Sequence, residues 1–170
     1  MKTRVLLLVA VAMGTFVSAQ PVSAATTIVR GIQTPVDSGP CFNASAAIST
    51  TMGGGLTGCW WVDTITPDPL DPVSYTPGGT VVFSGTEHFT GCVNTNRDAD
   101  CDPGEPSGTF FTTFTFTAQF DANGNEIHGR CHHPITSGTG GFAGISGVVN
   151  FTDVVTTTPP TSPYWGPIRL

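Results

Sequence analysis

Residues Thr109 to Ile135 read TFFTTFTFTAQFDANGNEIHGRCHHPI, and this stretch decides the fold class. In its first part, apolar residues fill one set of alternate positions: Phe110, Phe114, Phe116, Ala118 and Phe120. The other set is polar and consists of Thr113, Thr115, Thr117 and Gln119. Successive side chains of a β-strand point to opposite faces of the sheet, so this period of two predicts a half-buried strand.

The dipeptide Asn123-Gly124 follows this strand and predicts a two-residue β-hairpin turn. A type I′ turn needs positive φ at both positions, which these residues tolerate. On one face the turn predicts four pairs: Ala122–Asn125, Phe120–Ile127, Ala118–Gly129 and Phe116–Cys131. On the other face it predicts three: Gln119–His128, Thr117–Arg130 and Thr115–His132. Apolar meets apolar and polar meets polar, which a register error of one residue would destroy.

Further strands are predicted on both sides of this hairpin. Those before it are Thr27–Gly31 and Val81–Thr90, and those after it are Gly147–Val154 and Tyr164–Leu170. Leu56–Ile65 is an apolar stretch that contains Trp60 and Trp61. No segment has a convincing helical period. Consecutive antiparallel strands that continue to the last residue fit a closed barrel, because closure leaves no exposed edge. We therefore expect an all-β fold.

The composition excludes several classes of protein. Only 11% of the residues are charged, Gly occurs 21 times and Pro 14 times, and the formal net charge is -6. Long amphipathic helices need more Ala, Leu, Glu and Lys than this chain has. A protein that binds nucleic acid through its phosphates needs a basic surface, so we expect no nucleic-acid partner.

The first residues have the pattern of a secretory signal peptide. Lys2 and Arg4 precede an apolar run, Val5–Met13, that is too short to span a bilayer. Small residues follow, and we expect cleavage near Ala24 or Ala25, with Ala19 as the alternative. Residues 1–24 are thus predicted to be a signal peptide and residues 25–170 a single secreted domain with no membrane span. Without Lys2 and Arg4 the formal charge becomes -8.

All five cysteines lie after the predicted cleavage site, where export favours disulfides. Cys92 and Cys101 bracket a short polar segment, and we predict a bond between them. Cys41, Cys59 and Cys131 cannot all pair within one chain, and both Cys41–Cys59 and Cys59–Cys131 stay open. One of the three is expected to be free and buried, or to form an intermolecular bond.

The stretch from Ile135 to Gly147, ITSGTGGFAGISG, followed by Phe151-Thr152-Asp153, resembles the allene oxide cyclase and dirigent-like families. The resemblance is closest to a secreted bacterial branch described only as allene-oxide-cyclase-barrel-like. It implies an eight-stranded, calycin-like antiparallel barrel, a homo-oligomeric state, and a lumen that steers the cyclisation or coupling of a reactive apolar intermediate. The positions that carry over are structural: Ile135, Gly138, Gly140, Phe142, Gly144 and Gly147. Glycines this closely spaced between two strands also permit sharp bends, and Phe142 would then plug one barrel end.

The second strand of the hairpin carries the row Glu126, His128, Arg130 and His132 on one set of alternate positions. In one interpretation this row is the wet outer face of the barrel, and phenylalanines fill the lumen or line an apolar pocket. In the other it lines the lumen and exchanges protons with a bound ligand. The candidate pocket residues are Glu87, His88, Glu126, His128, Arg130, Phe114 and Phe116.

The segment from Asn94 to Glu105 places oxygen-bearing side chains at the spacing of a twelve-residue calcium loop. Ala99 stands where that loop has glycine, and flanking helices are not evident. The candidate calcium ligands are Asn94, Asn96, Asp98, Asp100, Asp102 and Glu105.

Two functions follow from these features. In the first, the chain is a non-enzymatic extracellular binding or surface protein, because no complete catalytic constellation appears. In the alternative, it is a cyclase- or isomerase-like barrel that steers a small apolar substrate in its lumen. A lumenal cavity that contains Glu or His would favour the alternative, and a barrel packed solid with aromatic side chains would exclude it.

Overall fold

The computed structural model describes residues 25–68 and 78–170, and all regular secondary structure in this part of the chain is β-strand. The predicted signal peptide lies outside the described residues. The strands are β1 (Thr26–Pro35), β2 (Ile48–Gly54), β3 (Leu56–Thr66), β4 (Thr80–Val93), β5 (Ser107–Phe120), β6 (Glu126–Gly140), β7 (Ser146–Thr152) and β8 (Ser162–Arg169). No helix in these residues is long and apolar enough to cross a membrane.

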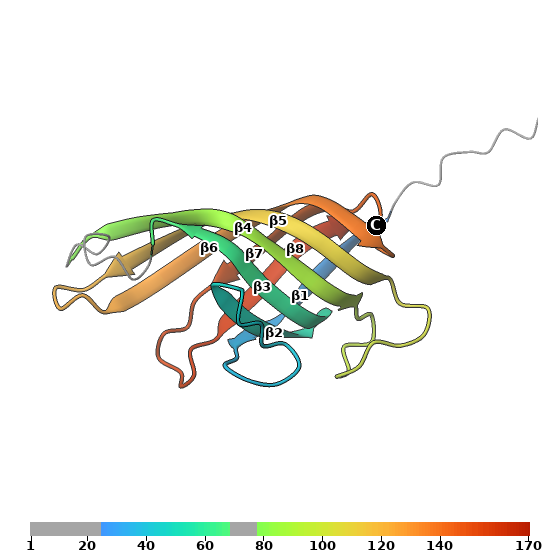
Figure 1. Ribbon diagram of the computed structural model, residues 1–170, viewed down its shortest axis with the longest axis horizontal. Coiled ribbons are helices and arrows are strands. Elements are labelled where there is room, and N and C mark those ends of the chain that lie inside the picture. Colours follow the sequence, from blue (N-terminus) through green and yellow to red (C-terminus); the bar gives the residue numbers. More distant parts are fainter. Residues whose placement is uncertain (1–24, 69–77) are drawn as a thin grey trace, which may run out of the picture.

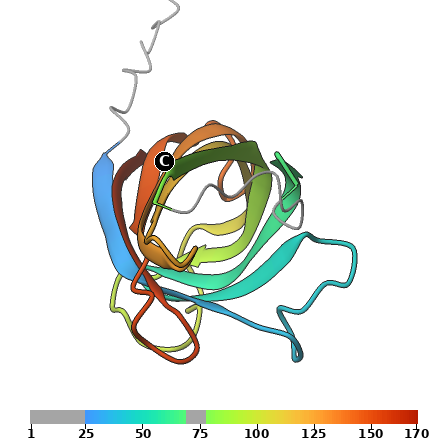
Figure 2. The same cartoon turned by 90° about the vertical axis from the view of Figure 1, so that its left-hand side faces the viewer.

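The eight strands form one closed barrel in which each strand pairs with its neighbours in sequence. All pairs are antiparallel, and β1 closes the barrel against β8. Figure 2 looks along the barrel and shows the strands as a ring around a central lumen. Strands β4, β5 and β6 are the longest, with 14, 14 and 15 residues, and they project at one end (Figure 1). The prediction of an eight-stranded antiparallel barrel is therefore confirmed.

Most strands were predicted close to their observed positions, but β2 was not predicted at all. Its seven residues, Ile48–Gly54, contain one serine, two threonines, two glycines and only two large apolar residues, so they lack a clear alternation. The strand forms because it can pair with β1 on one side and β3 on the other. Tertiary pairing thus overrides a weak local preference here.

The β5–β6 hairpin confirms five of the seven predicted pairs, from Thr115–His132 to Gln119–His128. The two predicted pairs nearest the turn are wrong. Phe120 lies opposite Glu126 instead of Ile127, because the register shifts by one residue after Gln119.

The cause of this shift is the turn. The Gly124 N–H donates to Asp121 O and the Asp121 N–H donates to Asn125 O, which leaves three residues in the loop instead of two. Within this turn only Gly124 has positive φ, at 81°. The Asp121 carboxylate accepts the N–H groups of Asn123 and Asn125, both at 2.8 Å, and so stabilises the longer turn.

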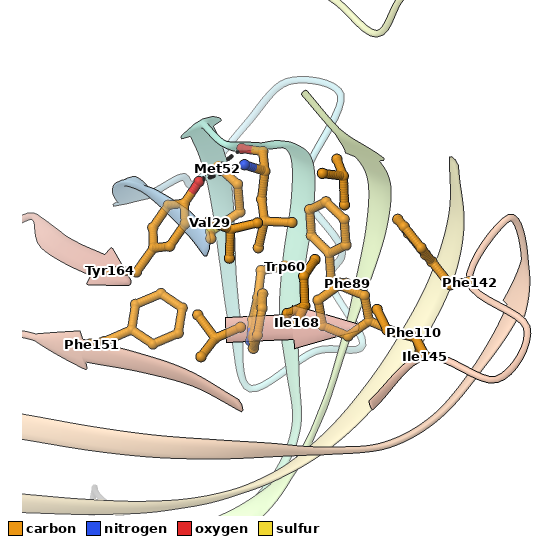
Figure 3. Close-up of a cluster of buried hydrophobic side chains, with 13 residues drawn as sticks. Val29, Met52, Trp60, Phe89, Phe110, Phe142, Ile145, Phe151, Tyr164 and Ile168 are labelled. Carbon is orange, nitrogen blue, oxygen red and sulfur yellow. Dashed lines mark hydrogen bonds between the residues drawn. The ribbon is translucent and has the colours of Figure 1, made fainter. Parts of the chain in front are cut away.

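One half of the lumen is filled by a dense core, shown in Figure 3. Trp60 and Phe110 are fully buried, and their rings meet edge to face with centroids 5.6 Å apart. Phe142 is also fully buried and packs on Phe110 at 5.5 Å, so it plugs this end of the barrel as the sequence predicted. Across the lumen, the Leu56 N–H donates to the Tyr164 hydroxyl at 2.7 Å.

The glycine-rich bend between β6 and β7 needs glycine at each position that the sequence singled out. Gly140, Gly144 and Gly147 have φ of 64°, 82° and 134°, values that residues with a Cβ rarely adopt. A Cβ on Gly138 would lie 2.3 Å from Phe142 O. The bend thereby brings Phe142 back over the end of the lumen.

Two disulfides are present. Cys92–Cys101 has the predicted pairing, and Cys41–Cys59 is the first of the two alternatives for the second bond. Cys131 is free. Disulfides persist in oxidising compartments, so both bonds are consistent with an extracellular protein.

Removing the Cys92–Cys101 bond should lower the unfolding free energy of the barrel. The Cys92→Ala/Cys101→Ala variant is expected to lose about 2–3 kcal/mol of unfolding free energy, because the bond restricts a short loop in the unfolded chain. Urea unfolding of both proteins under oxidising conditions measures this loss. A loss below about 0.5 kcal/mol would contradict the prediction.

Candidate ligand-binding cavity

The other half of the lumen is filled only in part, by a second cluster of buried apolar side chains that includes Phe83, Phe114 and Phe120. It contains a cavity of about 410 Å³ whose walls come from all eight strands and from the β7–β8 connection. The cavity lies at the end of the barrel that carries the β5–β6 turn, because Phe120 and Glu126, which flank this turn, line it. Trp60 and its neighbours form the dense half of the lumen (Figure 3). The lumen is thus divided into a packed half and a hollow half.

The wall of the cavity is largely aromatic. It includes Phe83, Phe114, Phe116, Phe120 and Phe151. Phe83 and Phe116 are nearly parallel, with centroids 6.1 Å apart. These side chains are the apolar set of β5 and its neighbours, so the predicted period of two directs them inward. The Phe row therefore faces the lumen, as the first interpretation of the sequence required.

A hydrogen-bonded pair of buried side chains lies on this wall. Glu87 on β4 and His133 on β6 are each 4% exposed, and Glu87 Oε2 lies 3.1 Å from His133 Nε2. His133 Nδ1 lies 3.2 Å from Val149 O, and the Thr112 hydroxyl donates to Glu87 Oε2 at 3.1 Å. Four strands therefore fix the orientation of this pair.

Aromatic rings enclose the imidazole of His133. Phe114 stacks on it at 6.0 Å, and Phe151 meets it edge to face at 4.5 Å. These rings keep water away from the pair, which strengthens its electrostatic interaction. A pair held in this way can donate a proton to a ligand and accept one from it.

Two further carboxylates line the cavity nearer to its mouth. The bulge after Gln119 turns Glu126 inward, and Glu126 Oε1 is buried with no hydrogen-bond partner among the described residues. Gly129 makes room for this carboxylate, because a Cβ there would lie 2.5 Å from Glu126 Oε1. Asp153, just after β7, accepts a hydrogen bond from the Ser162 hydroxyl at 2.6 Å.

Burial raises the pKa of Glu126 from its ordinary value of 4.5 to about 7, and the negative charge of Asp153 adds to this shift. Folding therefore favours the neutral form of Glu126. This contribution to stability is complete below pH 4.5 and is lost as the pH rises through about 7.

The Glu126→Gln variant should consequently be more stable than the wild type at pH 8 and equally stable at pH 4. Because Glu126 is only partly buried, solvent screening limits the gain to about 1 kcal/mol. Urea unfolding at both pH values measures it. Glu105→Gln is the control: hydrogen bonds from the Thr95 and Asp102 N–H groups lower the pKa of Glu105, so this variant should gain no stability at pH 8. A Glu126→Gln variant that is less stable at pH 8 would contradict the prediction.

The structure divides the predicted pocket residues between the two faces of the barrel. Glu87, Glu126, Phe114 and Phe116 line the cavity. His88, His128 and Arg130 do not. The expected row of four residues on one face is therefore interrupted, because the bulge places Glu126 on the opposite face from the three residues that follow it on alternate positions.

The three predicted pocket residues that point outward, His88, His128 and Arg130, have partners on the outer surface. His88 Nδ1 lies 2.9 Å from Asp63 Oδ2, and the His88 ring packs on Trp61. The Arg130 Nε–H donates to His128 Nε2 at 2.9 Å. His88, His128 and Arg130 therefore lie on the solvent-exposed outer face of the barrel, as the first interpretation of the sequence expected for the polar row.

The sequence analysis missed His133 and Asp153. A signal for His133 was present in the register: it shares the inward positions of β6 with Cys131, which the predicted hairpin pairs with Phe116. The inward position of Asp153 had no comparable signal, because it depends on where β7 ends.

Cys131 also lines the cavity as the free cysteine. Burial raises the pKa of its thiol, and the charges of Glu87 and Asp153 add to this effect. The thiol is therefore kept protonated and a poor nucleophile.

The structure places the candidate calcium residues in one loop, but their side chains bind the loop itself. The Asn94 Nδ2 donates to Asp98 Oδ1 and Asp100 O, and Glu105 Oε1 accepts the Thr95 N–H at 2.7 Å. The Asn96 Nδ2 donates to Asp102 Oδ2. Within residues 25–68 and 78–170, no group of three His, Cys, Asp or Glu side chains is placed to hold a metal ion.

The fold and the cavity together define a class: a small, disulfide-bonded, closed antiparallel β-barrel with a half-hollow acidic and aromatic lumen. The chain matches no family model, and no curated protein matches it either. The resemblance to the allene oxide cyclase and dirigent-like families thus stays a prediction.

Proposed function

We propose that this protein is a non-enzymatic extracellular binding protein that holds a small apolar molecule in the hollow half of its lumen. The observation that carries the proposal is the cavity of about 410 Å³ inside the barrel, beside a half of the lumen that a dense core of apolar side chains fills. Protein interiors are normally close-packed, and a void of this size sacrifices contacts that a smaller lumen would gain. A bound ligand restores those contacts.

The composition of the wall supports an apolar ligand. Ligand sites are mostly apolar, with a few polar groups that orient the bound molecule. Here five phenylalanines supply the apolar surface, and three carboxyl groups and His133 supply the polar groups.

Binding of a neutral apolar dye tests the proposal. N-phenyl-1-naphthylamine should bind wild-type protein with micromolar affinity and a rise in fluorescence. Val62→Trp places an indole in the cavity and should weaken binding at least about tenfold, which is about 1.4 kcal/mol. Val82→Trp makes the same change on the outer face of β4, where Val82 is 53% exposed, and should leave binding unchanged. Equal binding by wild type and Val62→Trp would place the dye elsewhere and contradict the proposal.

The cavity contains Glu and His side chains, which is the observation expected to favour the alternative function. The Glu87–His133 pair therefore supports a second candidate, an isomerase- or cyclase-like activity on the bound molecule. One partner can accept a proton from the ligand while the pair returns another, which leaves the protein unchanged as an isomerisation requires. The resemblance of Ile135–Asp153 to the allene oxide cyclase families supports this candidate.

Proton exchange distinguishes the two candidates. A ligand that copurifies with the protein from culture medium can be incubated in D₂O and followed by mass spectrometry. An enzyme should catalyse deuterium incorporation, and Glu87→Gln should abolish it. The absence of protein-dependent incorporation would contradict the second candidate and leave the binding function in place.

Secretion is part of the proposal. The signal-peptide pattern of residues 1–24 and the two disulfides support it. Recovery of the mature chain from the medium, with an N-terminus near Ala25, is the expected result.

A further inference from the structure

We infer that the ligand of the cavity has an apolar body and carries one protonated amine, which binds between Glu126 and Asp153. This inference rests on the proposed binding function and specifies the class of ligand. It depends on the charges of the cavity wall, on one unpaired oxygen, and on the position of the aromatic rings.

The wall of the cavity is strongly acidic. Three carboxyl groups line it, Glu87, Glu126 and Asp153, and the only basic lining side chain among the described residues is that of His133. No Arg or Lys is among the lining residues. Arg130, the arginine next to Cys131 in sequence, points to the outer face and donates to His128. An anionic ligand would therefore meet uncompensated negative charge, whereas a cation would meet opposite charge in a poorly hydrated space.

The three carboxyl groups of the cavity differ in their hydrogen-bond partners. Glu87 is bound by His133 and Thr112, and Asp153 is bound by Ser162. Glu126 Oε1 is buried and has no hydrogen-bond partner in the described part of the chain. A buried acceptor without a donor costs about 1–3 kcal/mol, so a donor from the ligand would remove a real penalty.

A neutral apolar ligand would increase the cost of the unpaired Glu126 oxygen, because it would exclude water from Glu126 and offer no hydrogen-bond donor. A protonated amine has several N–H donors and can bind Glu126 while its charge is attracted to Asp153. Phe116 also lines the cavity and lies beside Gly129, the residue that makes room for Glu126. The negative face of an aromatic ring adds to the stabilisation of a nearby cation.

A matched series of three probes tests the inference: 4-phenylbutylamine, 4-phenylbutanol and 4-phenylbutyric acid share one apolar body and differ only in the head group. Isothermal titration calorimetry at pH 8 and low salt compares them. The amine should bind at least about tenfold more tightly than the alcohol, and the acid should bind most weakly.

Two variants place the effect at the proposed position. Glu126→Gln should reduce the affinity for the amine about tenfold and change the affinity for the alcohol less than about twofold. Asp153→Asn should also reduce the preference for the amine over the alcohol. It provides a second test if Glu126→Gln does not fold. Asp37→Asn removes an exposed carboxylate from the β1–β2 connection and should leave all three affinities unchanged.

The outcomes separate this inference from the proposed function. Equal affinities for the amine and the alcohol, or tightest binding of the acid, would overturn the inference and leave the binding function supported. An amine preference that survives both cavity variants would also overturn it. If none of the three probes binds, both the inference and the proposed function are overturned.

Discussion

Replacement of Trp60 by alanine is expected to remove about 3–5 kcal/mol of unfolding free energy. Trp60 is fully buried at the centre of the barrel, where its ring contacts those of Phe89, Phe110 and Phe151 (Figure 3) and that of His133, at centroid distances of 5.2–6.1 Å. Alanine would lose the burial of the indole and would also leave a void that the rigid barrel cannot close. This void would lie between the packed half of the lumen and the wall of the cavity.

Urea unfolding measures the effect, and Trp165 provides a matched control. Trp165 is 58% exposed on the outer face of β8, so Trp165→Ala should change stability by about 0.5 kcal/mol or less. Similar losses for the two variants would mean that Trp60 does not act as the centre of the core.

Replacement of Glu87 by leucine is expected to cost about 3–5 kcal/mol. It would leave His133 Nε2 and the Thr112 hydroxyl buried with no partner at Glu87. The double variant Glu87→Leu/His133→Leu should cost less than Glu87→Leu alone, because two apolar side chains can replace a buried polar pair with little loss. The two effects are therefore expected to be strongly non-additive.

A double-mutant cycle by urea unfolding measures this coupling, and a pair on the outer surface serves as the control. His88 Nδ1 and Asp63 Oδ2 lie 2.9 Å apart, but solvent reaches both of these side chains. Asp63→Leu should therefore cost about 1 kcal/mol or less. Additive effects at Glu87 and His133 would contradict the prediction.

Much of the fold could be predicted from local patterns. The alternation from Phe110 to Phe120 predicted β5, the face it buries and five pairs of the hairpin. The glycine spacing predicted the bend and the plug formed by Phe142. In these places each residue's local preference agrees with the fold, which makes a pattern reliable.

The candidate site could be predicted only in part. Phe114 and Phe116 follow from strand alternation, whereas Glu87 was predicted together with His88, its neighbour on the opposite face. Glu126 reaches the lumen because of a bulge that the Asn123-Gly124 signal does not specify. The Asp121 carboxylate favours the longer turn, and this competing interaction turned Glu126 inward and left Ile127 exposed. His133 was not among the predicted pocket residues, although its register position on β6 is inward.

The sequence by itself left open which face of the central strands points inward, but it determined the fold class, one disulfide and the acidity of the protein. These depend on properties that lie along the chain: side-chain periodicity, turn chemistry and charge. Only the tertiary structure decided that the lumen is half packed and half hollow, that Glu87 meets His133, and that Glu126 and Asp153 line the same cavity. Those features depend on distances between strands far apart in sequence and on how much of the enclosed volume the side chains fill. No local pattern contains that information, because barrel closure sets both.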